Sequence, residues 1–349
     1  MYFHHLHFYL NDTAFWKVWF AHHLGFSSAA NMPNTLTQGN IEIRLSSSEY
    51  SSDVAHYLSQ HPSGLVDIAF ATDQFDAVLA TAQKQGATLL QPVSQQPSQQ
   101  RQCQLQGWAH LRHTLVEVSA DWIQAHHQTS QQQSTQSELL SLIDHVVINV
   151  PRGELSAAVQ WYQAVFGLQL GQSFEINTAN SGLCSQVLVH PEGTLQLPIN
   201  EPSSDNSQIQ EFLHHNRGAG VQHVALRSQN ALRAIAHFRN QGLQLLSVPQ
   251  TYYDTLKEQP DCPLYDLSDI TQQQLLLDWS KGGEQGMLLQ TFTQPIFAEP
   301  TFFFEVIERS DYKENGQVKI AQGFGEGNFQ ALFEAIEQSQ LERGSLTRT

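Results

Sequence analysis

The sequence of 349 residues is poor in charge, in cysteine and in long apolar runs. Charged residues make up 14% of the chain, and 17 Lys and Arg stand against 33 Asp and Glu, which gives a net charge of −16. Such an excess of negative charge repels phosphate backbones and argues against nucleic-acid binding. An anionic substrate would need a local cation, and a buried metal ion would supply one.

The scarcity of cysteine and of apolar runs bears on location. The three cysteines are far apart and form no CxxC pair, which argues against a disulfide framework and a zinc ribbon. No run approaches the roughly 20 apolar residues of a membrane span. The opening residues, MYFHHLHFYLND, do not have the pattern of a signal peptide. We therefore expect a cytoplasmic protein that does not cross a membrane.

An internal repeat is the main feature that is present. The runs YFHHLHFYL (2–10) and LIDHVVINV (142–150) both predict a strand, and each precedes a helix-like segment. Two further pairs of blocks repeat in the same order, 64–93 with 220–249 and 104–120 with 275–293. The repeat predicts an α+β protein of four βαβββ modules. We expect two modules per domain, forming a curved, mixed open barrel with outer helices.

A segment of low apolar content separates the two halves. Residues 123–138, which read QAHHQTSQQQSTQSE after Ile123, cannot bury enough surface to order themselves. We expect them to link an N-terminal domain (1–122) to a C-terminal domain (139–349). Near the end of the chain, the glycine-rich turn 323–328 precedes an amphipathic helix, which is either a lid over a site or a helix packed on the domain.

Three polar residues interrupt strongly apolar strands of the second half. His145 lies in IDHVVINV, His223 in VQHVALRS and Glu305 in TFFFEVIE. A buried carboxylate is costly without a partner, and two imidazoles with one carboxylate form the ligand set of non-haem Fe(II) oxygenases. Zinc accepts the same ligands. These residues alone therefore leave open an iron site, a zinc site or satisfied core histidines.

The second half also carries a longer series of motifs. They are IDHVVINV, WYQAVFGL, LPINEP, SQIQEFL, HHNRGAGVQHVAL, TYYDTL, LLQTFT, FFFEVIER and GFGEGNFQALFEAIE, in this order. This half resembles the 4-hydroxyphenylpyruvate dioxygenases, a family of the vicinal-oxygen-chelate (glyoxalase-like) superfamily. The first half is similar to the family only in its modular layout, so we expect that domain to be non-catalytic.

The resemblance implies a role for each site residue. It implies one Fe(II) per chain, bound by His145, His223 and Glu305. The catalytic polar residues that it implies are Ser185, Asn200, Gln222 and Gln290. The substrate-binding residues that it implies are Gln208, Phe292, Phe303, Phe324, Asn328 and Phe329. Two positions depart from the family, because Cys184 stands where Asn is common and Glu326 where Lys is usual. We interpret Tyr252 and Tyr253 of the TYY motif as structural.

The implied reaction joins O2 to 4-hydroxyphenylpyruvate, whose keto acid would chelate the iron, and gives homogentisate and CO2 after side-chain migration. This would serve tyrosine catabolism or quinone and tocopherol synthesis. The expected partners are the substrate and O2, with no nucleic acid and no membrane, and a homo-oligomer is possible. A 4-hydroxymandelate synthase is an alternative that the bulky Phe292 disfavours. A non-catalytic binding protein on the same scaffold is disfavoured by the intact ligand set.

Alignment of the two halves raises the question of a second metal site. It places His5, Asp67 and Glu117 at the positions of the three ligands of the second half, in that order. Two carboxylates with one imidazole suit a borderline metal less well than the intact triad. We therefore expect these three residues to be the relic of a metal site and not a second working site.

Overall fold

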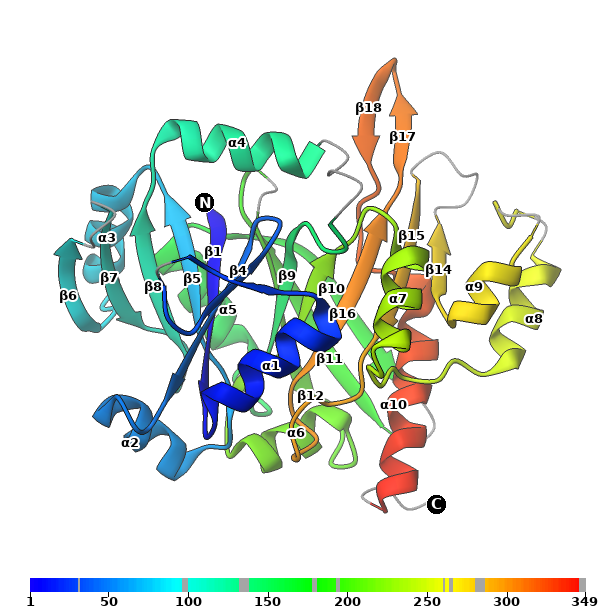
Figure 1. Ribbon diagram of the computed structural model, residues 1–349, viewed down its shortest axis with the longest axis horizontal. Coiled ribbons are helices and arrows are strands. Elements are labelled where there is room, and N and C mark those ends of the chain that lie inside the picture. Colours follow the sequence, from blue (N-terminus) through cyan, green and yellow to red (C-terminus); the bar gives the residue numbers. More distant parts are fainter. Residues whose placement is uncertain are drawn as a thin grey trace.

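The structure is a computed structural model, and it contains two eight-stranded sheets that lie beside each other (Figure 1). It describes residues 1–349 apart from 31, 96–99, 132–137, 178–180, 193–194, 260, 264–265, 280–285 and 345–349, and apart from the side chains of 128–131, 329, 330, 339 and 342. In the described part, no helix combines the length and the apolar character needed to cross a membrane.

The first sheet has the strand order β2-β3-β4-β1-β5-β8-β7-β6. Its strands are β1 (Tyr2–Leu10), β2 (Ser27–Ser28), β3 (Thr35–Gln38), β4 (Ile41–Ser47), β5 (Gly64–Thr72), β6 (Leu89–Gln95), β7 (Arg101–Gln106) and β8 (Arg112–Glu117). The helices of this half are α1 (Thr13–Leu24), α2 (Ser52–Gln60), α3 (Phe75–Lys84) and α4 (Ala120–Gln131). The sheet is mixed, because β1 runs parallel to β4 and antiparallel to β5.

The second sheet, β10-β11-β12-β9-β13-β16-β15-β14, repeats this order strand for strand. Its strands are β9 (Leu142–Asn149), β10 (Gln169–Asn177), β11 (Gly182–Val189), β12 (Gln196–Pro202), β13 (Gly220–Arg227), β14 (Leu276–Trp279), β15 (Met287–Phe292) and β16 (Phe303–Arg309). The helices around it are α5 (Leu155–Phe166), α6 (Gln208–Asn216), α7 (Ala231–Asn240), α8 (Gln250–Glu258) and α9 (Ser268–Gln273). The predicted duplication and fold class are confirmed.

Buried contacts join the two sheets into one core. Phe8 of β1 packs edge-on against Phe302 just before β16, with ring centroids 5.3 Å apart. Elsewhere the hydroxyl of Tyr162 in α5 donates to Nε2 of His113 in β8 at 2.9 Å. Nδ1 of the same imidazole lies 3.1 Å from the carbonyl of Ile68 and donates to it, which fixes the tautomer.

Helix α4 occupies the first part of the segment that we expected to remain unordered. Its helical structure continues to Gln131, so the expectation does not hold for residues 123–131. The reason lies at the start of the helix, where Trp122 stacks on His126 with ring centroids 3.3 Å apart and packs against Ala71, Val116 and Val118. Residues 132–137 lie outside the described residues.

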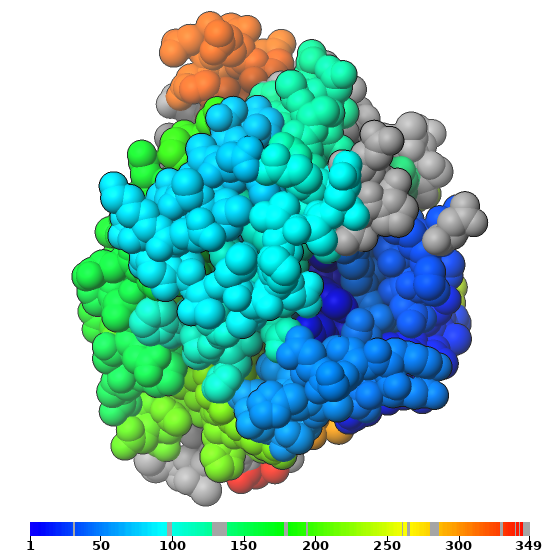
Figure 2. Space-filling model, turned by 90° about the vertical axis from the view of Figure 1, so that its left-hand side faces the viewer, coloured from blue at the N-terminus to red at the C-terminus, as the bar shows by residue number. Residues whose placement is uncertain are grey.

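A hairpin leads from the second sheet to the end of the chain. Its strands β17 (Asp311–Glu314) and β18 (Gln317–Ile320) project from the top of the molecule in both views (Figures 1 and 2). The glycine-rich segment follows, with a short 3₁₀ turn η1 (Glu326–Asn328), and then the predicted helix α10 (Phe329–Arg343). Phe333 of α10 is 2% exposed and packs against Leu183 and Phe212, so the helix is docked on the second half.

Candidate metal centre

The three predicted ligands come from adjacent strands of the second sheet. Ala225 of β13 pairs with His145 of β9 on one side and with Glu305 of β16 on the other. His223 lies two residues before Ala225 and therefore projects from the same face of β13. The register of the sheet thus brings together side chains that the chain separates widely.

The ligand atoms form a compact, buried group. Nε2 of His145 and Nε2 of His223 lie 3.2 and 3.5 Å from Oε2 of Glu305. All three ligand atoms fall within 4.8 Å of one another. Two imidazole nitrogens and one carboxylate oxygen in this arrangement fit a divalent metal with further positions open to other ligands. The predicted metal-binding triad is present.

A β-bulge places Asp144 beside the first ligand. The pairing of β9 with β13 shifts register at Asp144, which is an extra residue between two register pairs. Oδ1 of Asp144 lies 3.0 Å from Nδ1 of His145 and accepts its proton in a hydrogen bond. The bond leaves Nε2 of His145 as the ligand atom that faces the metal position.

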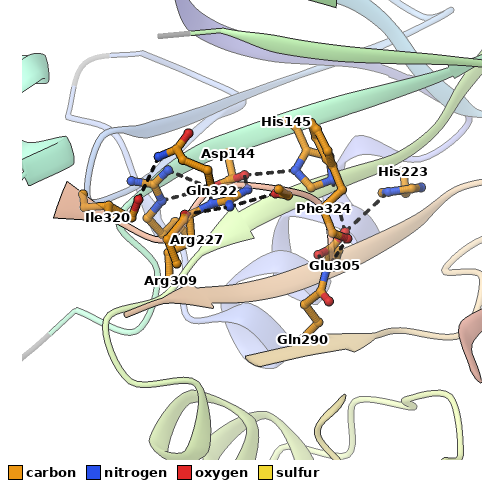
Figure 3. A network of polar contacts seen from close by, with 12 residues as sticks. Asp144, His145, His223, Arg227, Gln290, Glu305, Arg309, Ile320, Gln322 and Phe324 are labelled. Carbon is orange, nitrogen blue, oxygen red and sulfur yellow. Dashed lines mark hydrogen bonds and ion pairs between the residues drawn. The ribbon is translucent and has the colours of Figure 1, made fainter. Parts of the chain in front are cut away.

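Two arginines balance the buried carboxylate of Asp144 (Figure 3). Nη2 of Arg227 lies 2.7 Å from Oδ2, and Nη2 of Arg309 lies 2.7 Å from Oδ1. Burial raises the pKa of Asp144, but the two guanidiniums outweigh burial and hold the pKa well below its ordinary value. Our sequence analysis missed these three residues. A signal was available, since an Asp precedes the ligand histidine and an Arg ends each of two apolar strands.

The triad has the electrostatics of a cation site. Burial lowers the pKa of His145, yet the carboxylates of Glu305 and Asp144 raise it to about 9. Burial raises the pKa of Glu305, but the two imidazoles bring it down to about 2. Burial also lowers the pKa of His223, which Glu305 only partly offsets. The ionised Glu305 therefore needs a cation beside it, either a proton on His145 or a metal.

A cavity in front of the triad collects the other predicted residues. Those that line it are Ser185, Asn200, Gln208, Gln222, Gln290, Phe292, Phe303, Phe324 and Asn328. They come from β11, β12, α6, β13, β15, β16 and the segment before α10. The side chain of Phe329 lies outside the described residues. The structure brings these side chains to one place, and their roles toward a substrate stay predictions.

Aromatic rings surround the ligands. Phe303 stacks on His223 with ring centroids 4.8 Å apart, and Phe292 meets Phe303 edge-on at 6.2 Å. Phe324 lies edge-on to His145 at 5.2 Å. Sequence analysis missed the apolar lining residues Val147, Phe174, Ile176, Leu183, Val187, Pro198, Leu332, Phe333 and Ile336. Those on β10 and β11 occupy alternate positions, and this period of two is a signal that could have found them.

Gln290 connects the triad to the segment before α10. Its Nε2 donates to Oε1 of Glu305 at 2.9 Å and to the carbonyl of Phe324 at 3.0 Å. Its Oε1 accepts from Nδ2 of Asn328 at 2.9 Å. The hydroxyl of Tyr252 donates in turn to Oδ1 of Asn328 at 2.8 Å. Tyr252, which we interpreted as structural, thus holds the start of the closing helix.

Gln208 offers an unused acceptor to the cavity. Its side chain is 6% exposed, and its Oε1 is buried without a hydrogen-bond partner in the described structure. A buried acceptor without a donor costs about 1–3 kcal/mol. Gln208 is therefore suited to accept a hydrogen bond from a bound molecule.

The two departures from the family lie in different places. Cys184 is half-buried next to Ser185 in β11 and packs against the main core instead of lining the cavity. Glu326 lies in η1, where its Oε2 accepts from the backbone N–H of Phe324 at 3.3 Å. The first departure is thus outside the cavity, and the second is part of the segment that covers it.

The first half keeps the strand positions of the triad but not its ligands. His5 pairs with Ala69 of β5 just as His145 pairs with an alanine of β13, so this predicted match is confirmed. The predicted match of Glu117 is wrong. The pairing of β5 with β8 places Thr114 level with Ala69, three residues before Glu117.

The residues of the expected relic are engaged elsewhere. Asp67 accepts from the backbone N–H and the hydroxyl of Thr114 at 2.8 and 2.5 Å, and from Nε2 of Gln104 at 2.8 Å. Glu117 pairs with Arg101, with Oε2 and Nε 3.4 Å apart. His5, Asp67 and Glu117 are therefore not brought together as ligands.

Another small group of possible ligands lies nearby in the described part of the first half. It consists of His4, His5 and Glu42. His4 is the bulge residue of β1, and its Nδ1 lies 2.8 Å from Nδ1 of His5. The carboxylate of Glu42 is already paired with Nε of Arg44 at 2.7 Å, which makes this group a poorer cation site than the triad.

Comparisons with known proteins agree with this geometry. Residues 142–261 match the Glyoxalase/Bleomycin resistance protein/Dioxygenase superfamily. The chain is 33% identical over 317 residues to a 4-hydroxyphenylpyruvate dioxygenase of Caenorhabditis elegans, with 85% of this chain and 78% of the relative covered. It is 40% identical over 207 residues to that of Legionella pneumophila, with 59% and 56% covered. A solved mutant of 4-hydroxymandelate synthase from Streptomyces coelicolor has the same fold, with a TM-score of 0.79, 24% identity, and 97% of this chain and 98% of that chain covered.

Proposed function

Because the chain belongs to the 4-hydroxyphenylpyruvate dioxygenase family, we propose that it converts 4-hydroxyphenylpyruvate and O2 into homogentisate and CO2. We propose one ferrous ion per chain, held by His145, His223 and Glu305. The observation that carries this proposal is the buried triad itself, which faces a cavity walled by phenylalanine rings. A metal that activates O2 and an aromatic binding site belong together in such a reaction.

The metal and its surroundings would share the work at the keto-acid end. When bound, the iron supplies a chelation point for the keto acid and a site of O2 activation. The protein carries a net charge of −16, so the negative charge of the substrate is best met at the triad. Asp144 would hold the ring of His145 through Nδ1, so that Nε2 is the nitrogen that faces the metal.

The cavity would hold the aromatic ring and exclude water. Phe292 and Phe303 offer ring faces and edges to the substrate, and Phe324, Leu332 and Ile336 cover the cavity from the C-terminal side. Oε1 of Gln208 would accept a hydrogen bond from the phenol, because this buried oxygen has no hydrogen-bond partner among the described residues. Ser185, Asn200 and Gln222 would complete the polar contacts.

We propose a division of labour between the two halves. Residues 139–349 would form the catalytic domain, and residues 1–122 a non-catalytic domain that supports it, with 123–138 as the connection. In the first half, Asp67 and Thr114 stand at the positions of two of the three metal ligands, and this supports the assignment. A cytoplasmic location is part of the same proposal.

Identification of the product tests the proposal. The protein is reconstituted with Fe(II) without oxygen, mixed with 4-hydroxyphenylpyruvate and O2, and the product is identified by mass spectrometry. Homogentisate is the expected product, whereas 4-hydroxymandelate would assign the chain to the synthase reaction. Absence of oxygen uptake would reject both reactions.

A pair of histidine variants tests the ligand assignment. His223→Ala is expected to abolish turnover and metal binding while the circular dichroism spectrum stays that of the parent. His237→Ala, which changes an exposed histidine of α7, is the matched control and keeps both activities. Full activity of the His223→Ala protein would remove His223 from the site.

A further inference from the structure

The segment between β18 and α10, residues 321–328, is held at its backbone by two side chains of the sheet; we call it the hinge segment. Nη1 of Arg309 donates to the carbonyls of Ala321 and Gly323 at 3.1 and 2.9 Å. Nε2 of Gln290 donates to the carbonyl of Phe324 at 3.0 Å. The hinge segment carries Phe324 over His145, so these bonds determine where that ring lies.

Arg309 makes its remaining bonds to Asp144. Its Nε lies 2.8 Å from Oδ2 and its Nη2 lies 2.7 Å from Oδ1, a two-pronged contact in which both partners are buried. A guanidinium is planar and rigid, so its prongs cannot move independently. A shift of Asp144 would therefore shift Nη1, and with it the carbonyls of the hinge segment.

Both contacts continue to ligands of the triad (Figure 3). Asp144 bonds to Nδ1 of His145, so Arg309 joins the hinge segment to His145 through one carboxylate. Gln290 bonds directly to Oε1 of Glu305. The cover of the cavity is thus connected to two of the three ligands by buried, directional hydrogen bonds.

We propose that Arg309 is a positioning residue that makes metal binding and closure of the hinge segment depend on each other. The inference rests on metal binding by the triad, which is part of the proposed function. A bound metal fixes His145, and His145 fixes Asp144 and Arg309 in the position that holds the carbonyls of Ala321 and Gly323. By linkage, a closed hinge segment raises metal affinity by the same factor by which the metal favours closure.

The test uses Co(II) as the probe metal and two readouts that need no turnover. Hydrogen exchange of peptides that cover residues 321–328 reports closure, and titration of the visible Co(II) spectrum reports affinity. In the parent protein, Co(II) is expected to slow exchange of this segment by about fivefold or more, the lower end of common coupling factors. In the Arg309→Gln protein, exchange is expected to be faster, the effect of Co(II) to disappear, and affinity to fall by a similar factor.

Arg227→Gln is the matched control. Arg227 pairs with the same carboxylate from β13, so this variant weakens the hold on Asp144 but keeps the bonds of Arg309 to the hinge segment. We expect weaker Co(II) binding with preserved slowing of exchange. Arg309→Lys keeps the charge beside Asp144, yet a single ammonium cannot reach both the carboxylate and the two carbonyls. If Arg309→Gln does not fold, the Arg309→Lys protein tests whether Arg309 couples metal binding to closure of the hinge segment.

The outcomes separate this inference from the proposed function. A parent protein that binds no Co(II) and yields no homogentisate would reject the proposed function. A parent protein that binds Co(II) and turns over, with unchanged slowing of exchange in folded Arg309→Gln or Arg309→Lys, would reject the role of Arg309 alone. The role of Arg309 is supported if Co(II) no longer slows hydrogen exchange of the hinge segment in the Arg309 variants but still slows it in Arg227→Gln.

Discussion

Gly325 sits where the backbone of the hinge segment passes the side chain of Gln290. Its φ is 74°, a left-handed conformation that L side chains rarely adopt, and a Cβ would lie 1.8 Å from Oε1 of Gln290. Both the conformation and the space require glycine. Because Gln290 bonds to Glu305, any displacement at Gly325 is transmitted to the triad.

Gly325→Ala is therefore expected to reduce homogentisate formation at least about tenfold, since a misplacement of about 1 Å near a reacting centre costs up to a hundredfold. The matched control is Gly316→Ala in the β17–β18 turn, where φ is 79° but no atom lies within 4 Å of the added Cβ. That variant suffers only the backbone strain of about 1–2 kcal/mol and keeps its activity. Equal rates for the two variants would contradict the argument from space.

At the scale of single residues, the sequence predicts the metal ligands better than the residues that hold those ligands in place. His145, His223 and Glu305 are conspicuous because each is a polar residue within an apolar strand. Asp144 and Arg309 are not, because their ion pair depends on a bulge in β9 and on a strand pairing that joins distant parts of the chain. The sequence does show an Asp before His145 and an Arg at the end of an apolar strand, but it does not show the bulge or the strand pairing that joins them.

Helix α10 shows how an element closes a site. Phe333 enters a small cluster with Leu183, Ile209 and Phe212, and it lines the cavity as well. The hydroxyl of Ser181 donates to Oε1 of Glu337 at 2.6 Å and adds a polar contact on the same side. The helix that the sequence leaves open as a lid or a packed element is in fact packed, and it covers the cavity.

Phe333→Ala is expected to weaken docking of α10 by about 3–5 kcal/mol, the usual cost of removing a buried phenyl ring. The C-terminal helix should then be cleaved faster by chymotrypsin, which can cut after Leu332 and Leu341 within α10, and homogentisate formation should fall. Glu334→Ala changes the neighbouring exposed residue of the same helix and serves as the control. Unchanged cleavage of the Phe333→Ala protein would show that this ring does not hold the helix.

Register is the part of element structure that the sequence predicts least well. The order of strands and helices follows from the repeat, whereas the alignment of the two halves predicts that Glu117 takes the position of Glu305. The structure shows a difference of three residues, because Thr114 takes that level in β8. Adjacent positions in two apolar strands look alike until the partner strand is known, and an odd shift turns a side chain to the other face.

Over the whole molecule, the two halves share one core and a buried polar contact between them. His113 of β8 meets Tyr162 of α5 there, and the imidazole is completely buried. Burial lowers the pKa of His113 to about 4, although the carbonyl of Ile68 and the carboxylate of Asp67 oppose the shift. An unfolded chain takes up this proton near pH 6.5, whereas the folded protein does so only near pH 4.

The free energy of unfolding is therefore expected to decrease as the pH falls from 6.5 to 4, by about 1.4 kcal/mol per pH unit for this histidine. His113→Gln removes the titrating group and should reduce that slope by about this amount, as measured by urea unfolding at several pH values. His22→Gln, at an exposed position of α1, is the control. A slope that stays the same in His113→Gln would contradict the assignment.

The duplicated register gives the first half a use in protein engineering. His5 already occupies the level of His145, while Asp67 and Thr114 occupy the levels of the other two ligands. Asp67→His together with Thr114→Glu would therefore recreate the donor set of the C-terminal centre on a scaffold that shares its strand order. Elemental analysis should then find two metal ions per chain, and one in either single variant. The strand order that the two halves share therefore means that two side-chain changes, with no change of the backbone, are expected to create a second metal site.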